Sequence, residues 1–214
     1  IENITKTFSP GTANEKRALK GVSLHMKPKD FVTVIGGNGA GKSTLLNAIA
    51  GIFSVDSGKI IIDGNDVKKL PEHQRAQYIG RVFQDPRMGT ATDMTIEENM
   101  SMALRRGKSR TLRKGITKKE KDMFREYLHM LDLGLENRMS AKAGLLSGGQ
   151  RQALTLLMAT MTKPKLLLLD EHTAALDPKT AKKVLELTKK IIEEEQLTAL
   201  MITHNMKDAL KHGN

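Results

Sequence analysis

Residues 36–44, GGNGAGKST, form a glycine-rich loop of the kind that binds nucleotide phosphates. The loop fits the pattern G-x-x-x-x-G-K-[ST], in which glycines let the backbone approach phosphate oxygens closely. Lys42 is expected to reach the β- and γ-phosphates, and the Ser43 hydroxyl is expected to ligate Mg²⁺. The sequence therefore predicts a nucleotide-binding loop formed by Gly36, Gly37, Asn38, Gly39, Ala40, Gly41, Lys42, Ser43 and Thr44.

Two adjacent carboxylates, Asp170 and Glu171, follow the apolar run LLLL. The end of a parallel strand is where open α/β sheets bind ligands, so Asp170 is suited to hold Mg²⁺ directly or through water. Successive strand residues point to opposite sides, and the two carboxylates need not share one task. Glu171 is suited to accept a proton from an attacking water. In a chain without a phosphate loop, the same two carboxylates could equally be surface residues at the end of a strand.

A second glycine loop lies at residues 145–154, LLSGGQRQAL. Ser147, Gly148 and Gly149 stand just before an expected helix, where bare N–H groups and the helix dipole also attract phosphate. The chain thus carries two phosphate-binding loops, although one nucleotide needs only one of them.

Helix and strand patterns alternate around these motifs. Short apolar runs predict strands at 31–36, 58–64, 78–84, 165–170 and 198–203. Helical spacing of apolar residues predicts helices at 42–51 and 179–195, a last helix from Met206, and three more over 95–106, 117–133 and 149–162. The pattern predicts an α/β layered core that is interrupted by an all-helical insert near 90–162.

Charge is concentrated in one segment of this 214-residue chain of net charge +11. Residues 105–125 hold ten Lys or Arg and two acidic residues. That segment could be a solvated surface, or it could contact anionic lipid, a partner protein or nucleic acid. Aromatic residues make up 3% and Trp is absent, which disfavours base stacking. The absence of cysteine excludes disulfides and fits a reducing cytoplasm. No apolar run approaches the ~20 residues of a membrane helix.

The motifs GGNGAGKST, LSGGQ and LLLLDEHTAALD, in this order, closely resemble those of the ATP-binding-cassette (ABC) ATPases. The resemblance runs through the whole chain. It implies one domain over 1–214, with a nucleotide-binding core at about 1–89 and 163–214 and a helical subdomain at about 90–162. It also implies a P-loop NTPase core with a mainly parallel sheet and an N-terminal antiparallel β region, binding ATP and Mg²⁺.

Further roles follow only from this resemblance. Gln84 in VFQDP looks like the glutamine that contacts Mg²⁺ and relays nucleotide state to the membrane partner. His204 in ITHN looks like the histidine that contacts the γ-phosphate, and Asp177 in AALD like an aspartate at the dimer interface. Phe8 stands where the family places an aromatic ring on adenine, but it could instead be a core or edge-strand residue.

The family pattern also explains the two glycine loops. In that family two subunits pair head to tail, and the signature loop of one, here LSGGQ at residues 146–150, closes over the γ-phosphate held by residues 36–44 of the other. A two-fold dimer then forms two identical composite sites. The resemblance thus implies an ATP-dependent homodimer, with trans contacts from Ser147, Gly148, Gly149 and Gln150.

The chain departs from the family pattern in three places. His172 follows Glu171 where many relatives have Pro. It is either a second titratable group near the γ-phosphate or a local variant. The chain also ends soon after His204 and begins inside the expected first strand, so we expect a C-terminal piece to be missing.

The resemblance implies a peripheral subunit on the cytoplasmic face of the membrane, working with separate permease subunits. The sequences of residues 36–51 and 166–181 most resemble those of ATPases that drive amino-acid import, with aromatic amino acids as candidate solutes. Such an importer would use an extracellular solute-binding protein. The alternatives are an exporter ATPase, or a soluble cassette ATPase that acts on nucleic acid or ribosomes. The latter usually carry two cassettes or a long coiled-coil insert, so we expect no nucleic-acid partner.

Overall fold

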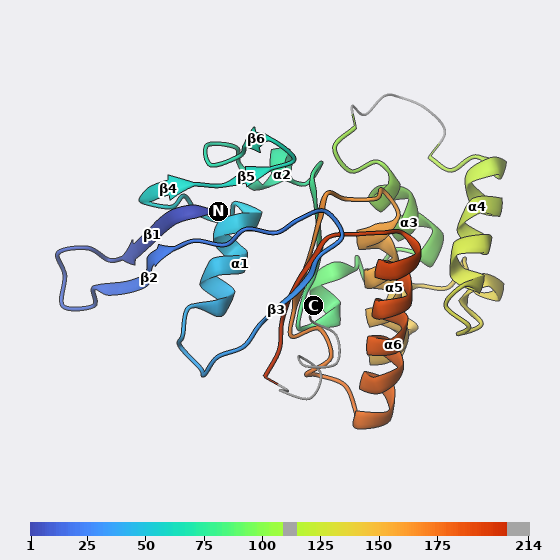
Figure 1. Cartoon of the computed structure of the whole chain (residues 1–214). Helices are drawn as coiled ribbons and strands as arrows, with labels where there is room; N and C mark the ends of the chain where they lie inside the picture. The colour runs from blue at the N-terminus through green and yellow to red at the C-terminus, as the bar shows by residue number, and fades with distance from the viewer. Residues whose placement is uncertain (109–114, 205–214) are drawn as a thin grey trace.

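The structure is a computed structural model that describes residues 1–108 and 115–204 (Figure 1). The helix expected from Met206 lies outside these residues. The fold is mixed α/β, with one parallel sheet, a separate antiparallel region and a helical region, as predicted.

A four-stranded parallel sheet forms the centre of the molecule. Its strands lie in the order β3 (Phe31–Val34), β9 (Ala199–Ile202), β8 (Leu166–Asp170) and β7 (Ile79–Val82). All four lie inside predicted strands. Their apolar composition follows from their position, because helices cover a parallel sheet on both faces.

Alternate residues of the central strand β8 face different helices. Leu168 belongs to the same core cluster as helix α1 (Lys42–Ala50), whereas Leu169 packs in the cluster that includes residues of α5 (Gly148–Thr160) and α6 (Pro178–Glu194). Figure 1 shows the same arrangement, with α1 on one side of the sheet and α5 and α6 on the other. The two-residue period of the strand thus divides the core into two layers.

An antiparallel sheet packs beside α1, in the strand order β2 (Lys16–Val22), β1 (Glu2–Phe8) and β4 (Ser57–Lys59). The single strand predicted over 58–64 is wrong, because this run is divided between two sheets. Its second half, β5 (Ile61–Ile62), turns back to pair with β6 (Asn65–Asp66).

The division of that strand has a local cause. Asp63 and Gly64 between β5 and β6 both have positive φ, of 52° and 77°. Two consecutive residues with positive φ form the tight turn that suits a two-residue hairpin, and Asp-Gly is a preferred sequence for it. The signal was therefore present in the sequence, but the apolar run around it concealed the turn.

The described part of residues 95–162 contains helices and turns and no extended strand. Its main helices are α3 (Ile96–Leu104), α4 (Lys118–His129) and α5, which confirms the three predicted ones. Capping boxes begin all three helices, because a Ser or Thr and a Glu or Gln three residues later bond each other's backbone amides. These helices enclose their own apolar cluster, which includes Met100, Phe124 and Leu154.

Short helical turns complete the described elements. They are α2 (Glu72–Arg75), η1 (Pro86–Gly89), η2 (Leu135–Asn137) and η3 (Ala143–Leu145). Within residues 1–108 and 115–204, no helix has the length and apolar character that crossing a bilayer would require.

Candidate nucleotide site

Part of the predicted site lies at the carboxyl ends of the parallel strands. The phosphate loop follows β3, Gln84 comes shortly after β7, Asp170 ends β8, and His204 comes shortly after β9. The strand register aligns these ends, since Ile202 of β9 pairs with Val34 on one side and with Asp170 on the other. Residues from four distant parts of the sequence therefore meet where open α/β sheets bind ligands.

The phosphate loop wraps around the side chain of Lys42. Lys42 Nζ donates hydrogen bonds to the carbonyl oxygens of Gly36, at 2.7 Å, and of Gly37, at 3.0 Å. Residues 37–40 and Ser43 are exposed. The amino group is thus held inside a loop whose outer residues are open to an incoming phosphate.

Gly41 shows why this loop requires glycine. Its φ is +91°, and a Cβ atom there would lie 2.6 Å from the carbonyl oxygen of Ala18 in β2. Both the left-handed backbone and the close approach exclude a side chain. The loop is therefore positioned by the antiparallel sheet as well as by its own helix.

Glu171 and His204 form a direct pair, with His204 Nε2 2.6 Å from Glu171 Oε1. The Glu171 side chain is 12% exposed and that of His204 is 45% exposed. Glu171 has a left-handed backbone, with φ of 45°, and its amide donates to the carbonyl oxygen of Ile202 at 3.1 Å. Because of this turn, the side chains of Glu171 and Asp170 point in different directions, and the Glu171 carboxylate points toward His204.

Arg81 is a site residue that the sequence analysis missed. Its Nη2 lies 3.5 Å from Asp170 Oδ2 and donates to Asn47 Oδ1 at 2.6 Å. The guanidinium also lies over the Phe83 ring, 4.6 Å from its centroid. An arginine inside the apolar strand run YIGRVFQ was the available signal, because a charge in a buried strand needs a partner.

The oxygen donors of the site fit Mg²⁺. They are the Ser43 hydroxyl, the Gln84 amide oxygen and the Asp170 carboxylate, all hard ligands that this ion accepts. The described residues contain no group of three or more His, Cys, Asp or Glu that could hold a metal ion by itself. Proteins commonly bind Mg²⁺ through one or two carboxylates, with water and phosphate completing its shell.

Gln84 is exposed and is positioned through its neighbours. The carbonyl oxygen of Phe83 accepts a hydrogen bond from Gln152 Nε2 of α5 at 3.0 Å. On the other side, Asp85 caps η1 through the amide of Arg87. Hydrogen bonds from the Arg87 side chain, and then from its amide, lower the pKa of Asp85. The segment around Gln84 is thus attached to α5, the helix that follows the signature loop.

Ser147 caps α5, accepting from the Gln150 amide at 3.3 Å, while its own amide donates to Gln150 Oε1 at 3.1 Å. Gly149 is pressed against α6, since a Cβ atom there would lie 2.2 Å from Thr180 Cγ2. The signature loop and the start of α6 are therefore packed together.

Asp177 caps α6, and its carboxylate accepts from the Thr180 amide at 3.1 Å. Hydrogen bonds from Thr180 hold the pKa of Asp177 below its usual value. Because α1 and α5 lie on opposite faces of the sheet, the two glycine loops begin helices on different sides of the molecule (Figure 1). Contacts of Ser147, Gly148, Gly149, Gln150 and Asp177 with nucleotide remain predictions.

Phe8 ends β1, and its ring meets that of Phe53 edge to face, with centroids 5.2 Å apart. Lys6 Nζ lies 5.6 Å from the Phe8 centroid and 5.5 Å from the Phe53 centroid. This packing gives Phe8 a structural role at the end of the middle strand of the antiparallel sheet. Its contact with adenine remains a prediction.

The basic segment is only partly a solvated surface. Arg105 is an internal bridge, donating to the carbonyl oxygens of Ser101 and Gly115 and pairing with Glu120 at 3.0 Å. Arg106 donates to the Met158 carbonyl oxygen at 3.5 Å, and burial lowers its pKa. These two arginines anchor the end of α3 through their hydrogen bonds, and their contact with lipid remains a prediction. Arg110 and Arg113 lie outside the described residues.

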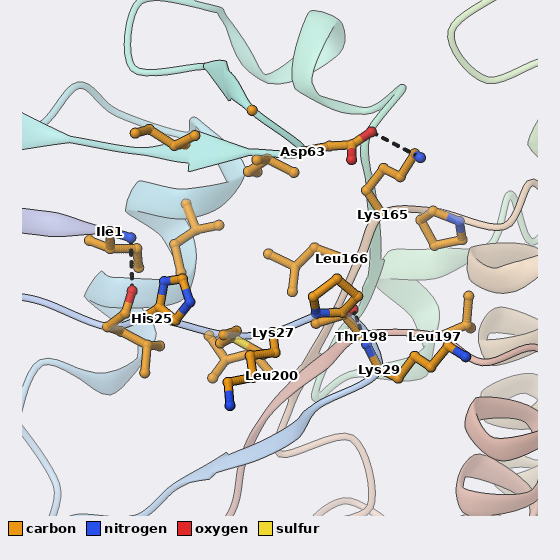
Figure 2. A pocket seen from close by; sticks show the side chains of 18 of the residues that line it. Ile1, His25, Lys27, Lys29, Asp63, Lys165, Leu166, Leu197, Thr198 and Leu200 are labelled. Atoms are coloured by element: carbon orange, nitrogen blue, oxygen red, sulfur yellow. Dashed lines mark hydrogen bonds and ion pairs between the residues drawn. The ribbon is translucent and has the colours of Figure 1, made fainter.

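A large cleft lies at the opposite ends of the strands from the site (Figure 2). Its volume is about 840 Å³, and its lining includes Leu166, the first residue of β8, and Thr198, just before β9. An ion pair between Lys165 and Asp63, at 2.9 Å, crosses one side. None of the predicted nucleotide-site residues lines it. A smaller pocket of about 270 Å³ adjoins Glu171 and His204.

Comparison with known proteins agrees with this geometry. The family model of the ABC transporter matches residues 19–174. The tyrosine transport ATP-binding protein of Clostridioides difficile is 44% identical over 214 residues, which is 100% of this chain and 85% of that protein. The energy-coupling factor transporter ATP-binding protein EcfA1 of Streptococcus pyogenes is 34% identical, covering 97% of this chain and 71% of its own.

Solved structures give the same result. The ATP-binding cassette MJ0796, in a dimeric post-hydrolysis state bound to ADP and Pi, matches with a TM-score of 0.81 and 32% identity, covering 99% of this chain and 90% of that one. MJ1267, an ABC transporter cassette in its ADP conformation, has a TM-score of 0.79 and 29% identity over 99% of this chain and 83% of its own. The chain belongs to the ABC transporter family, as an ATP-binding and ATP-hydrolysing subunit.

Proposed function

We propose that this chain drives the import of an amino acid, with tyrosine or another aromatic amino acid as the first candidate. The observation that carries the proposal is the 44% identity, over the whole chain, to a protein named for tyrosine transport. In this proposal the subunit lies on the cytoplasmic face of the membrane beneath separate permease subunits. An extracellular solute-binding protein delivers the amino acid.

ATP binding uses groups at the ends of β3, β7 and β8. Lys42 Nζ exchanges its two carbonyl partners in the phosphate loop for the β- and γ-phosphates, and the loop amides bind the remaining oxygens. Ser43, Gln84 and Asp170 would hold Mg²⁺, which would neutralise charge on the phosphates. Asp170 would move from Arg81, whose second partner Asn47 keeps the arginine in place.

Hydrolysis uses the pair of Glu171 and His204. A water molecule attacks the γ-phosphorus, the bond to the β–γ bridging oxygen breaks, and its electron pair stays on ADP. Glu171 accepts the proton that the water loses. His204, beside the carboxylate at 2.6 Å, orients it and contacts the γ-phosphate.

The second half of each site comes from another copy of the chain. The amides at the start of α5 and the Ser147 hydroxyl approach the γ-phosphate bound by the partner. The MJ0796 cassette is a dimer with ADP and Pi bound, which supports this arrangement. ATP then joins two subunits, and hydrolysis separates them.

Uptake of labelled tyrosine by cells that lack the gene tests the direction and the solute. We expect reduced uptake, restored by the wild-type chain and not by Glu171→Gln. Competition by unlabelled phenylalanine or tryptophan would define the solute class. Unchanged uptake with slower efflux would replace import by export. A chain found only on ribosomes or DNA would remove the transport proposal, and assembly with an energy-coupling factor membrane component would favour the EcfA1-like alternative.

A further inference from the structure

His172 is buried directly beside the proposed catalytic carboxylate. It follows Glu171 and is 1% exposed. Its Nε2 lies 3.0 Å from the hydroxyl of Thr188, which belongs to α6. A hydrogen bond therefore joins the turn after β8 to the helix that begins at Asp177.

The direction of this hydrogen bond follows from the partners of Thr188. The Thr188 hydroxyl has one hydrogen, and it donates that hydrogen to the Val184 carbonyl oxygen at 2.7 Å. With that hydrogen on the Val184 carbonyl oxygen, Thr188 accepts from His172, and on this basis we assign a hydrogen to Nε2 of His172. Because this hydrogen points into α6, it is not directed toward an incoming γ-phosphate.

Glu171 needs such a restraint. Its φ of 45° is uncommon for a residue with a side chain, and such a backbone persists only where the surrounding structure holds it. The Glu171 amide is bonded to the Ile202 carbonyl oxygen, and its carbonyl oxygen accepts from the Ala174 amide at 2.9 Å. His172 holds the next residue to α6 through its side chain. The Glu171 backbone is thus fixed both to the sheet and to a helix.

We propose that His172 is a positioning residue for ATP hydrolysis. By donating to Thr188, it fixes the left-handed turn at Glu171 and keeps the carboxylate against His204. It also ties that carboxylate to α6, whose first turn packs on Gly149 of the signature loop. The inference deepens the proposed role of Glu171 as general base and rests on it. Of the two interpretations of His172 open from the sequence, a second titratable group near the γ-phosphate or a local variant, the proposal adopts the local variant and gives it a task.

Thr188→Val tests the bond, because it removes the acceptor and keeps the size of the side chain. Displacing a general base lowers the rate of hydrolysis more than the affinity for nucleotide, and a displacement of 1 Å can lower the rate roughly 10²-fold. We expect kcat per bound nucleotide to fall about 10- to 100-fold. The KM for ATP and the dissociation constant of ATP should change less than about twofold. Thr188→Ser restores the hydroxyl and should restore kcat.

Thr160→Val is the matched control. Thr160 is also buried, and its hydroxyl also bonds a carbonyl oxygen four residues earlier, that of Leu156 at 3.0 Å. It lies on α5 and its hydroxyl is bonded to no histidine among the described contacts. Its kcat should match the wild type. The His172 Nε2–H proton, observed by imidazole ¹⁵N–¹H NMR, should be present in the wild type and exchange rapidly in Thr188→Val.

Three outcomes would overturn the proposal. Thr188→Val could keep the kcat of Thr160→Val. The loss of kcat in Thr188→Val could be matched by an equal loss of nucleotide affinity. Thr188→Ser could also fail to restore kcat. Either of these two results would make the bond purely structural. Glu171→Gln, assayed in parallel, separates these failures from a failure of the base assignment. If that variant hydrolyses ATP normally, Glu171 is not the base and the positioning role falls with it.

Discussion

His204 Nε2 lies 2.6 Å from Glu171 Oε1, which joins the loops that follow two adjacent parallel strands. Asp170 pairs with Ile202 in the register of β8 and β9, so the residues that follow them emerge at the same level. The left-handed turn at Glu171 then directs its carboxylate toward the histidine. The proposed proton acceptor and the proposed γ-phosphate contact are thereby placed side by side.

Glu171→Gln should bind ATP and fail to hydrolyse it. The amide keeps the shape of the side chain, cannot accept a proton, and removes one negative charge beside the triphosphate. We expect hydrolysis to fall by at least ~10²-fold. ATP binding should persist or tighten, because Lys42 and Ser43 are unchanged. Sedimentation should detect a dimer with Mg-ATP and a monomer without it.

Ser147→Arg in the Glu171→Gln background should abolish that dimer, while each monomer still binds one ATP. The arginine blocks the γ-phosphate pocket of the partner, but it also removes the cap of α5, which is worth about 1 kcal/mol. Ser147→Ala loses the same cap and the hydroxyl contact but adds no bulk, so it should weaken dimerisation with ATP without abolishing it. A Ser147→Arg protein that still dimerises would refute the role of the signature loop.

Phe8→Ala should weaken ATP binding if the ring stacks on adenine. Stacking of a base on an aromatic ring is worth ~1–3 kcal/mol in nucleic-acid complexes, so the dissociation constant should rise roughly 10- to 100-fold. Because Phe8 also packs on Phe53, Phe53→Ala is the control that removes this contact and keeps Phe8. Equal affinities of the wild type and Phe8→Ala in a fluorescent-nucleotide titration would remove Phe8 from the site.

Arg75→Met should destabilise the fold without touching the nucleotide site. The Arg75 guanidinium is buried and donates to four carbonyl oxygens, two of them in the last turn of α1, those of Ala48 and Ile49. A buried carbonyl that loses its partner costs about 1–3 kcal/mol. We expect the free energy of unfolding to fall by about 3 kcal/mol or more, measured by denaturant titration.

Gly51→Ala should also destabilise the protein, through the same arginine. Gly51 has φ of +86°, and a Cβ atom there would lie 2.8 Å from Arg75 Nε. Gly64 is the matched control, because its φ of +77° is similar and no atom lies within 4 Å of its Cβ position. Gly64→Ala should lower the free energy of unfolding by about 1–2 kcal/mol because of the left-handed backbone, and Gly51→Ala should lower it further. Equal losses of stability in the two variants would show that the Arg75 side chain moves to make room for the methyl group.

Glu120 should contribute to stability at neutral pH and not in acid. The Thr117 amide donates to its carboxylate at 2.7 Å and, with weaker contributions from the Thr117 hydroxyl and Arg105, lowers the pKa of Glu120. A lowered pKa in the folded state stabilises the fold above the unfolded pKa, and this stabilisation is lost as pH falls through the folded value. Glu120→Gln should therefore lower the melting temperature at about pH 7, and this difference should shrink as the pH falls through the folded pKa of Glu120. A difference that stays constant throughout an acid titration would contradict the prediction.

The sequence by itself determined the local structures. The spacing of glycines, Lys42 and Ser43 defines a phosphate loop, because only glycine accepts the backbone that Gly41 adopts. Ser or Thr followed by Glu or Gln begins the helices, because those side chains bond the first free amides. Each of these signals lies within a few residues of the structure that it specifies.

The tertiary structure alone decided which of these elements meet. The order β3-β9-β8-β7 brings His204 to Glu171, and the contact of β7 with β8 brings Arg81 to Asp170. The sequence leaves open whether His172 is a titratable group near the γ-phosphate or a local variant, and only the packing of α6 brings Thr188 to it. The physical reason is the distance along the chain over which each effect acts. Backbone preferences and side-chain periodicity act over a few residues. Strand order and buried polar pairs depend on how elements far apart in the sequence pack together.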